Sequence, residues 1–166
     1  MMKRIALLLV LVLSAWTLKA QDPPPQGGFP NPKLTVSKSG KVALTYSRWD
    51  KEIVKGTPAL VFFWASWSDE SRALAPEIQK VYQKYGVIGK IKVLGVPYGD
   101  EISDTMEAVT ELGIKFPHLF DVEDDLAGPF ELGSVPLVVL IGADGEVIRN
   151  GLQGDEIQEA VEVIVK

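Results

Sequence analysis

The sequence contains no cysteine and a single histidine, His118. Without cysteine the chain cannot form disulfide bonds, bind an iron–sulfur cluster through thiolates or catalyse reactions by thiol chemistry. One histidine is too few for a zinc site built from cysteine and histidine ligands. We therefore expect neither a metal nor another cofactor.

Basic residues are scarce. Lys and Arg number 17 against 22 Asp and Glu, and residues 1–20 contain three of the basic residues and none of the acidic ones. The remainder therefore holds 14 basic and 22 acidic residues, a formal net charge of −8. Since an acidic domain repels phosphate backbones, nucleic acid is not an expected partner.

The chain has no apolar run long enough to span a membrane. Its longest one reaches from Ile5 to Leu18 at most, short of the ~20 residues that a bilayer requires. The run follows the cations Lys3 and Arg4 and leads into a more polar stretch that ends at Ala20, an order typical of a cleavable signal peptide. We expect residues 1–20 to be removed and the mature protein to be soluble and extracytoplasmic, either periplasmic or secreted.

Proline and glycine are concentrated in residues 21–32, which hold five of the eleven prolines. This composition predicts a flexible tether ahead of one domain, residues 33–166. Apolar runs predict buried strands and helical spacing predicts helices. The expected elements are a hairpin of 34–37 and 42–46, a short helix to 54 opened by a capping box of Ser47 and Asp50, strands 59–64 and 91–96, helices 71–85, 103–112 and 155–165, an extended piece 116–120 and a hairpin of 138–141 and 146–149. Strands alternating with helices indicate an α/β sandwich.

Two segments resemble hallmarks of thioredoxin-like proteins. ALVFFWASWSDESRALAP resembles their active-site segment, an apolar strand followed by W-A-x-W-C-x-x-C-[KR] and a later proline, with Ser68 and Ser71 at the two cysteine positions. GSVPLVVLIGADGEVI resembles the second hallmark, which assigns Pro136 as a cis-proline preceded by Val135. The segment between them is similar to the TlpA-like and redoxin branch. The resemblance covers about residues 42–166 and implies a three-layer α/β/α sandwich with a mixed central sheet, here with an N-terminal hairpin extension.

Three departures from that family remove its chemistry. A serine hydroxyl stays protonated where a cysteine at a helix N-terminus would ionise, so it cannot form a mixed disulfide. Asp69 and Glu70 stand between the two positions, where their charge suits the first helical turn and disfavours a thiolate. Phe62 replaces the buried acid that assists proton transfer in many thioredoxins. We therefore expect no thiol–disulfide exchange.

A hydrolytic role for Ser68 or Ser71 would need a general base. His118 is the single candidate and lies far away in the apolar segment FPHLF, so we expect a structural or surface histidine and interpret Ser68 as a helix N-cap. Trp64 is expected in the core. The acidic run 121–125 lacks the Gly and distal Glu of an EF-hand loop, so we interpret it as a solvated loop.

Two function classes remain open. In the first, a groove formed by Trp67, Ser68, Val135 and Pro136 binds an extended polypeptide segment of an extracytoplasmic partner without reacting with it. In the second, the chain is a variant of a TlpA-like thiol–disulfide oxidoreductase family, whether its Cys-to-Ser changes are natural or engineered. The altered Asp69, Glu70 and Phe62 favour natural loss. A purely structural domain is a third possibility, and the sequence does not indicate an oligomeric state.

Overall fold

The computed structural model describes residues 30–166, so the predicted signal peptide and nearly all of the predicted tether lie outside the described residues. The strands are β1 Asn31–Val36, β2 Val42–Ser47, β3 Ala59–Trp64, β4 Lys92–Pro97, β5 His118–Leu119, β6 Leu137–Ile141 and β7 Val147–Asn150. The helices are α1 Trp49–Glu52, α2 Asp69–Val81 with a π-helical continuation Tyr82–Gly86, α3 Ile102–Glu111, a 3-10 turn Gly128–Phe130 and α4 Asp155–Ile164.

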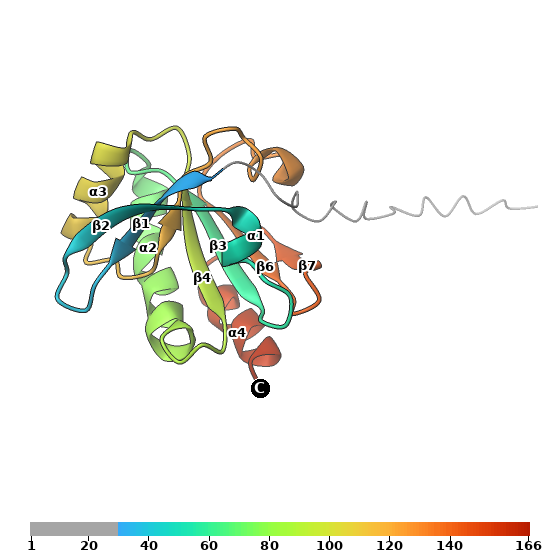
Figure 1. The fold of residues 1–166 in the computed structure, drawn as a ribbon. Helices are drawn as coiled ribbons and strands as arrows, with labels where there is room; N and C mark the ends of the chain where they lie inside the picture. The colour runs from blue at the N-terminus through green and yellow to red at the C-terminus, as the bar shows by residue number, and fades with distance from the viewer. Residues whose placement is uncertain (1–29) are drawn as a thin grey trace, which may run out of the picture.

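The seven strands form one open sheet in the order β2-β1-β5-β4-β3-β6-β7 (Figure 1). The pairs β3–β4 and β4–β5 are parallel, and the other neighbouring pairs are antiparallel. The predicted α/β fold with a mixed central sheet is therefore confirmed, as is the hairpin that extends it at the N-terminal side.

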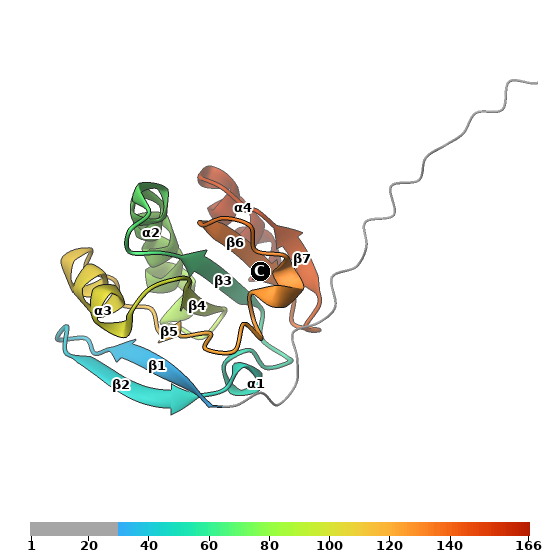
Figure 2. The ribbon, with the colours of Figure 1, turned by 90° about the horizontal axis from the view of Figure 1, so that it is seen from above.

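Helices cover the two faces of the sheet unequally. Helices α2, α3 and α4 pack on the face that carries Leu60, Phe62 and Trp64. The short α1 and the segment around Leu126 and Phe130 cover the other face, as the view from above shows (Figure 2). The second helical layer is thus thinner than the predicted sandwich implies.

Strand β3 is the centre of both cores. Successive side chains of a strand point to opposite faces, so its six residues divide between the two layers. Because both faces are covered, all six are apolar and fully buried. This burial fixes the position of the loop that follows Trp64.

Three local expectations are corrected. Ser47 does not open a capping box, because it is the last residue of β2, and its hydroxyl donates a hydrogen bond to Glu52. Strand β1 begins at Asn31, two residues before the predicted domain boundary, since Asn31 pairs with Ser47. Helix α2 begins at Asp69 instead of Ser71. Within residues 30–166, no helix is long and apolar enough to cross a membrane.

Candidate functional site

The two segments that resemble thioredoxin hallmarks meet at one edge of the sheet. Strands β3 and β4 are parallel and paired up to Trp64 and Pro97, so the loops that follow them leave the sheet together. Strand β6 runs antiparallel to β3 and pairs its Leu137 with Phe63, which brings the preceding Pro136 to the same edge. We call this the site edge: residues 65–72, 98–104, 120–125 and 131–136.

Ser68 and Ser71 are bonded to the start of α2. Ser68 is the N-cap of the helix, and its Oγ accepts a hydrogen bond of 3.1 Å from the backbone N–H of Ser71. The Ser71 Oγ in turn accepts from the backbone N–H of Ala65 at 3.3 Å. The Ser68 hydroxyl also contacts a carboxylate oxygen of Glu70, at 3.3 Å. Both serines are buried and serve as acceptors for backbone donors, so the predicted N-cap role of Ser68 is confirmed.

Asp100 holds the loop between β3 and α2 in place. One of its carboxylate oxygens accepts from the backbone N–H of Ser66 at 2.7 Å, and the other accepts from the Ser66 hydroxyl at 2.9 Å. The buried Thr105 donates a third hydrogen bond, at 3.3 Å. This residue is not among those predicted from the sequence. The signal that could have found it is its place just after β4, since the carboxyl ends of neighbouring parallel strands share one edge.

Trp67 is the most exposed tryptophan in the described chain. Its side chain is 66% exposed, whereas Trp64, three residues earlier, is completely buried as expected. The indole N–H of Trp67 donates to the carbonyl of Gly99 at 3.3 Å. The ring is therefore held at the surface by the β4–α3 loop and keeps most of its area accessible to solvent.

Val135 and Pro136 complete the site edge. The peptide bond between them is cis, and both residues are half-buried. Strand pairing of β6 with β3 begins one residue later, at Leu137. Among the described residues, the backbone of Val135 makes no hydrogen bond, so its N–H and C=O are open to a further strand.

His118 lies away from the two serines, inside the sheet. It is completely buried in β5, with its ring centroid 5.0 Å from that of Phe116 and 5.4 Å from that of Trp64. Neither ring nitrogen has a hydrogen-bond partner in the described part of the chain. Burial lowers the pKa of His118 to about 3. The histidine is thus structural, and the structure offers Ser68 no general base from it.

The interior beneath Ser68 has no acid on β3. Phe62 is fully buried, and its ring stacks on that of Trp64 with centroids 5.9 Å apart. An aromatic pair packs well there and carries no exchangeable proton. This position therefore cannot assist proton transfer to or from the helix N-terminus.

The acidic run 121–125 has a structural use. One carboxylate oxygen of Asp121 accepts from the backbone N–H groups of Leu126 and Ala127, at 3.0 and 2.7 Å. Burial raises the pKa of Asp121, and the charges of Asp124 and Asp125 add to this effect. Within residues 30–166, no group of three or more histidine or acidic side chains has the geometry of a metal site.

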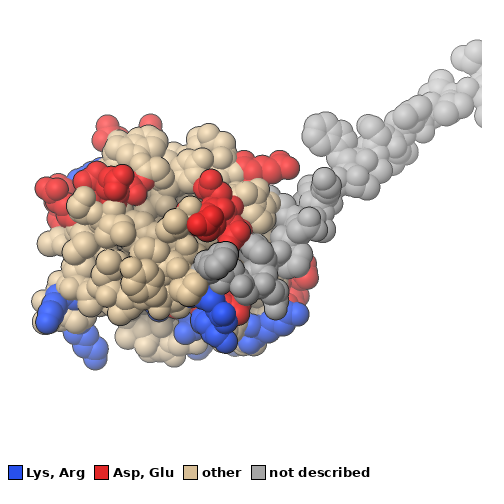
Figure 3. Space-filling view, turned by 45° about the horizontal axis from the view of Figure 1, so that its top comes forward, with Lys and Arg blue, Asp and Glu red and all other residues tan. Residues whose placement is uncertain are grey.

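Acidic side chains surround the site edge. Figure 3, in which the upper part of Figure 1 is turned toward the viewer, shows carboxylates around an uncharged centre and most cations toward the opposite end. Arg72 is the single basic residue in the four segments of the site edge, and it pairs with Glu111 at 2.8 Å. The electrostatic potential at this edge is therefore negative.

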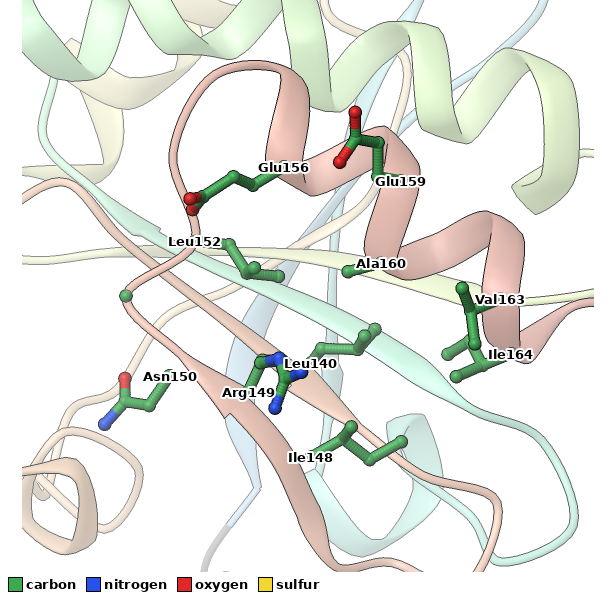
Figure 4. A pocket seen from close by; sticks show the side chains of 11 residues that line it. Leu140, Ile148, Arg149, Asn150, Leu152, Glu156, Glu159, Ala160, Val163 and Ile164 are labelled. Atoms are coloured by element: carbon green, nitrogen blue, oxygen red, sulfur yellow. The ribbon is translucent and has the colours of Figure 1, made fainter.

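A cavity of about 500 Å³ lies between β7 and α4 (Figure 4). Its lining combines apolar side chains such as Leu140, Ile148 and Val163 with the charged Arg149 and Glu156. No residue of the site edge contributes to it.

Sequence relatives support the resemblance to thiol–disulfide oxidoreductases. The chain is 25% identical over 113 residues to the thiol-disulfide oxidoreductase ResA of Bacillus thuringiensis, covering 68% of this chain and 64% of the relative. The match thus spans a little under two thirds of the length of that relative. A shorter match, 51% identical over 37 residues, joins the chain to the thioredoxin-like protein slr1139 of Synechocystis, covering 22% of this chain and 32% of the relative.

Solved structures share the fold. The thioredoxin domain of the thiol-disulfide oxidoreductase BVU-2223 from Bacteroides vulgatus superimposes with a TM-score of 0.65 at 20% identity, covering 90% of this chain and all of that one. A thiol-disulfide oxidoreductase from Bacteroides fragilis has a TM-score of 0.65 at 16% identity, covering 86% and 98% of the two chains. The thioredoxin-like fold and the TlpA-like resemblance are therefore confirmed, in a chain without cysteine. The model of the AhpC/TSA family matches residues 29–150, and the chain belongs to that family.

Proposed function

We propose that this chain is an exported, non-catalytic member of its family that binds an extended polypeptide segment at the site edge. The segment would lie beside Trp67 and Ser68 and against the backbone of Val135, next to Pro136. The observation that carries this proposal is the exposure of Trp67, which is 66% exposed on a loop that is otherwise fixed by hydrogen bonds.

The exposure of Trp67 supports binding because the ring is ordered before any partner arrives. Its hydrogen bond to Gly99 fixes the indole, and Asp100 fixes the loop through Ser66. A rigid aromatic side chain loses little conformational entropy when it is covered, and tryptophan is enriched among residues that dominate binding energies.

The backbone of Val135 supports an extended conformation for the partner. Its N–H and C=O make no hydrogen bonds with other described residues, and they lie where β6 ends. A segment that pairs with a free backbone adds itself as a strand, and its side chains then alternate between the surface and solvent.

Binding without turnover follows from the chemistry at Ser68 and Ser71. Both hydroxyls already accept backbone N–H donors, and Phe62 stands where an acid would be needed on β3. Among the described residues the single base in contact with either serine is the carboxylate of Glu70, which accepts from Ser68 at 3.3 Å, and no histidine contacts them. A partner could therefore bind and leave chemically unchanged. The alternative function, thiol–disulfide exchange, would require a thiol that this chain does not have.

Selection of peptides tests the proposal. A library of unstructured, cysteine-free peptides is presented to the exported protein, to Trp67→Ala and to Tyr46→Ala. Tyr46 is the matched control, since it is 70% exposed and lies on the edge strand β2. We expect the wild type and Tyr46→Ala to select the same peptides and Trp67→Ala to lose them. Selection of those peptides by Trp67→Ala, or of none by the wild type, would refute the proposal.

Export is tested separately, by the intact mass of the protein recovered outside the cytoplasm. We expect a chain that begins at or near Gln21, because the segment before it has the order of a signal peptide. Retention of residues 1–20 on a membrane-bound form would contradict this.

A further inference from the structure

The lining of a pocket next to Trp67 indicates which charge the expected partner carries. It has a volume of about 410 Å³ and lies between the start of the β4–α3 loop and the segment after β5. Gly99, whose carbonyl accepts the Trp67 indole N–H, is one of its lining residues. The pocket and the exposed indole are therefore neighbours on the same edge.

The lining of this pocket is apolar and acidic at once. Pro97, Ile102 and Phe120 supply the apolar part, and Asp100, Glu101 and Asp121 supply the acidic part. A lysine or arginine side chain has the matching structure, since its aliphatic stem prefers apolar contacts and its head is cationic.

The carboxylates of the pocket differ in how they are used. Asp100 accepts three hydrogen bonds and is committed to the loop. Asp121 uses one oxygen for two backbone N–H groups, whereas its other oxygen is buried and has no partner among the described residues. Glu101 is exposed and makes no side-chain hydrogen bond or ion pair within that part of the chain. Glu101 thus has an accessible carboxylate left for a cation, and the buried unpaired oxygen of Asp121 adds to the negative charge beside it.

The rest of the site edge has the same sign. Acidic side chains occur in all four of its segments, and its single cation, Arg72, is already paired with Glu111. The site edge contains Asp69, Glu70, Asp100, Glu101, Asp104, Asp121, Glu123, Asp124, Asp125 and Glu131. A cationic segment would be attracted to this surface from a distance, and an acidic one would be repelled.

We infer that the partner segment is cationic: it crosses the indole face of Trp67 and places a lysine or arginine side chain in the pocket of Asp100, Glu101 and Asp121. The inference rests on the proposed function, because it specifies the chemistry of the segment bound there. Trp67 contributes directly, since a cation above an indole face is attracted by the ring. Neutral and acidic segments are the competing occupants.

The test uses synthetic peptides of equal length that differ only in whether their charged positions hold lysine, glutamine or glutamate. Affinities are measured by the fluorescence anisotropy of dye-labelled peptides, at low and at physiological ionic strength. We expect the lysine peptide to bind at least about tenfold more tightly than the glutamine peptide at low salt, with the difference falling as salt screens exposed charges. The glutamate peptide should bind weakest.

Charge-reversal variants test which carboxylates of the protein cause the preference for the lysine peptide. The variant Asp69→Lys with Glu101→Lys changes two exposed carboxylates of the site edge, and Glu156→Lys with Glu159→Lys makes the same change in net charge on α4. We expect the first pair to abolish the preference for lysine and the second to leave it within about twofold of the wild type, because distant charges are screened. Equal losses in both variants would show that the net charge of the protein, and not the pocket, causes the preference for the lysine peptide. The inference would then be wrong.

The outcomes separate this inference from the proposed function. If the glutamine or glutamate peptide binds as tightly as the lysine peptide and Trp67→Ala still abolishes binding, the site edge binds segments of another charge and the inference is wrong. If no peptide binds through Trp67, the proposed function itself fails.

Discussion

The site edge and the interior beneath it differ in whether their polar side chains are hydrogen-bonded. At the edge, the hydroxyls of Ser68 and Ser71 accept backbone N–H donors, and Asp100 accepts three hydrogen bonds. Just inside the sheet, the indole N–H of Trp64 and both ring nitrogens of His118 are buried without partners in the described chain. Hydrogen bonds at the edge therefore hold the loop and the start of α2, whereas the interior depends on groups that stay neutral.

This difference explains how the scaffold can exist without its cysteines. Serine is a good N-cap, and a thiol is a weak hydrogen-bond acceptor, so serine at these two positions favours the start of α2. In the interior, Phe62 stands on β3 and packs on Trp64. Both changes suit a stable binding surface and neither suits proton or electron transfer.

The largest expected effect is a loss of folding stability at low pH that is caused by His118. The pKa of His118 falls from 6.5 to about 3 on folding. Between these two pH values the unfolded chain binds a proton that the folded chain does not, so stability is lost as pH falls. The loss approaches about 1.4 kcal/mol per pH unit across that range. Urea unfolding at several pH values measures it.

The control for this prediction is His118→Phe, which removes the titrating group and keeps a ring. The carboxylates contribute to acid unfolding in both proteins, so the difference between the two pH profiles isolates His118. Parallel profiles between pH 6.5 and pH 3 would show that His118 is not the acid-sensitive group.

The next largest effect comes from the contact of His118 with Gly95. These residues pair across β4 and β5, and a methyl group at Gly95 would lie 2.3 Å from Cδ2 of the imidazole. We expect Gly95→Ala to cost about 3 kcal/mol, because the strands on both sides restrict any adjustment. Gly133→Ala is the matched control, since nothing lies within 4 Å of its added methyl group.

A double-mutant cycle sharpens this result. In a His118→Ala background, Gly95→Ala should cost much less than in the wild type, because the ring that it meets is gone. The same cost in both backgrounds would place the strain elsewhere in the sheet.

Sequence patterns predicted the strands and helices well where burial determined them. The fully apolar β3 and the helical spacing of Leu74, Ile78 and Val81 leave few alternatives. The capping box at Ser47 was wrong because pairing with Asn31 keeps that residue in β2. A local pattern contains no information about such a partner, which lies 16 positions earlier in the chain.

The same limit applies to the site. Ser68, Ser71 and Pro136 could be placed from their neighbours in sequence, since the resemblance includes them. Asp100 could not, because its role depends on Ser66 in a loop 34 residues away. Parallel strands bring these loops together, and the contact exists only in the folded chain.

An effect of intermediate size is expected for Asp100 at the edge. Asp100→Ala leaves the N–H and hydroxyl of Ser66 without their acceptor, and we expect a loss of about 2 kcal/mol in stability. Asp104→Ala, whose recorded side-chain hydrogen bond is a single one of 3.3 Å with Ser103, should cost less than about 0.5 kcal/mol. Thermal unfolding of both variants decides this. Equal losses would mean that Asp100 does not hold the loop.

The smallest expected effect on stability is that of placing cysteines at positions 68 and 71. Ser68→Cys with Ser71→Cys should form an intramolecular disulfide, since the two positions are one helical turn apart. In the reduced form we expect a loss of about 1 kcal/mol, because the N-cap acceptor is weakened. Glu70 contacts position 68, so its charge should raise the pKa of that thiol.

Adding Glu70→Gln to the restored pair tests the last point. Titration of the thiol by its ultraviolet absorbance should give a lower pKa for Cys at position 68 in this variant. An unchanged pKa would show that the acids between the two positions do not act on the first one.

The measurement that tests the central claim most directly is backbone hydrogen exchange of the protein, with and without a saturating peptide selected on it. Binding at the site edge predicts slower exchange in residues 65–68, 98–101 and 133–137 and no change around the cavity between β7 and α4. Protection confined to β7 and α4, or none at residues 65–68, would contradict the account.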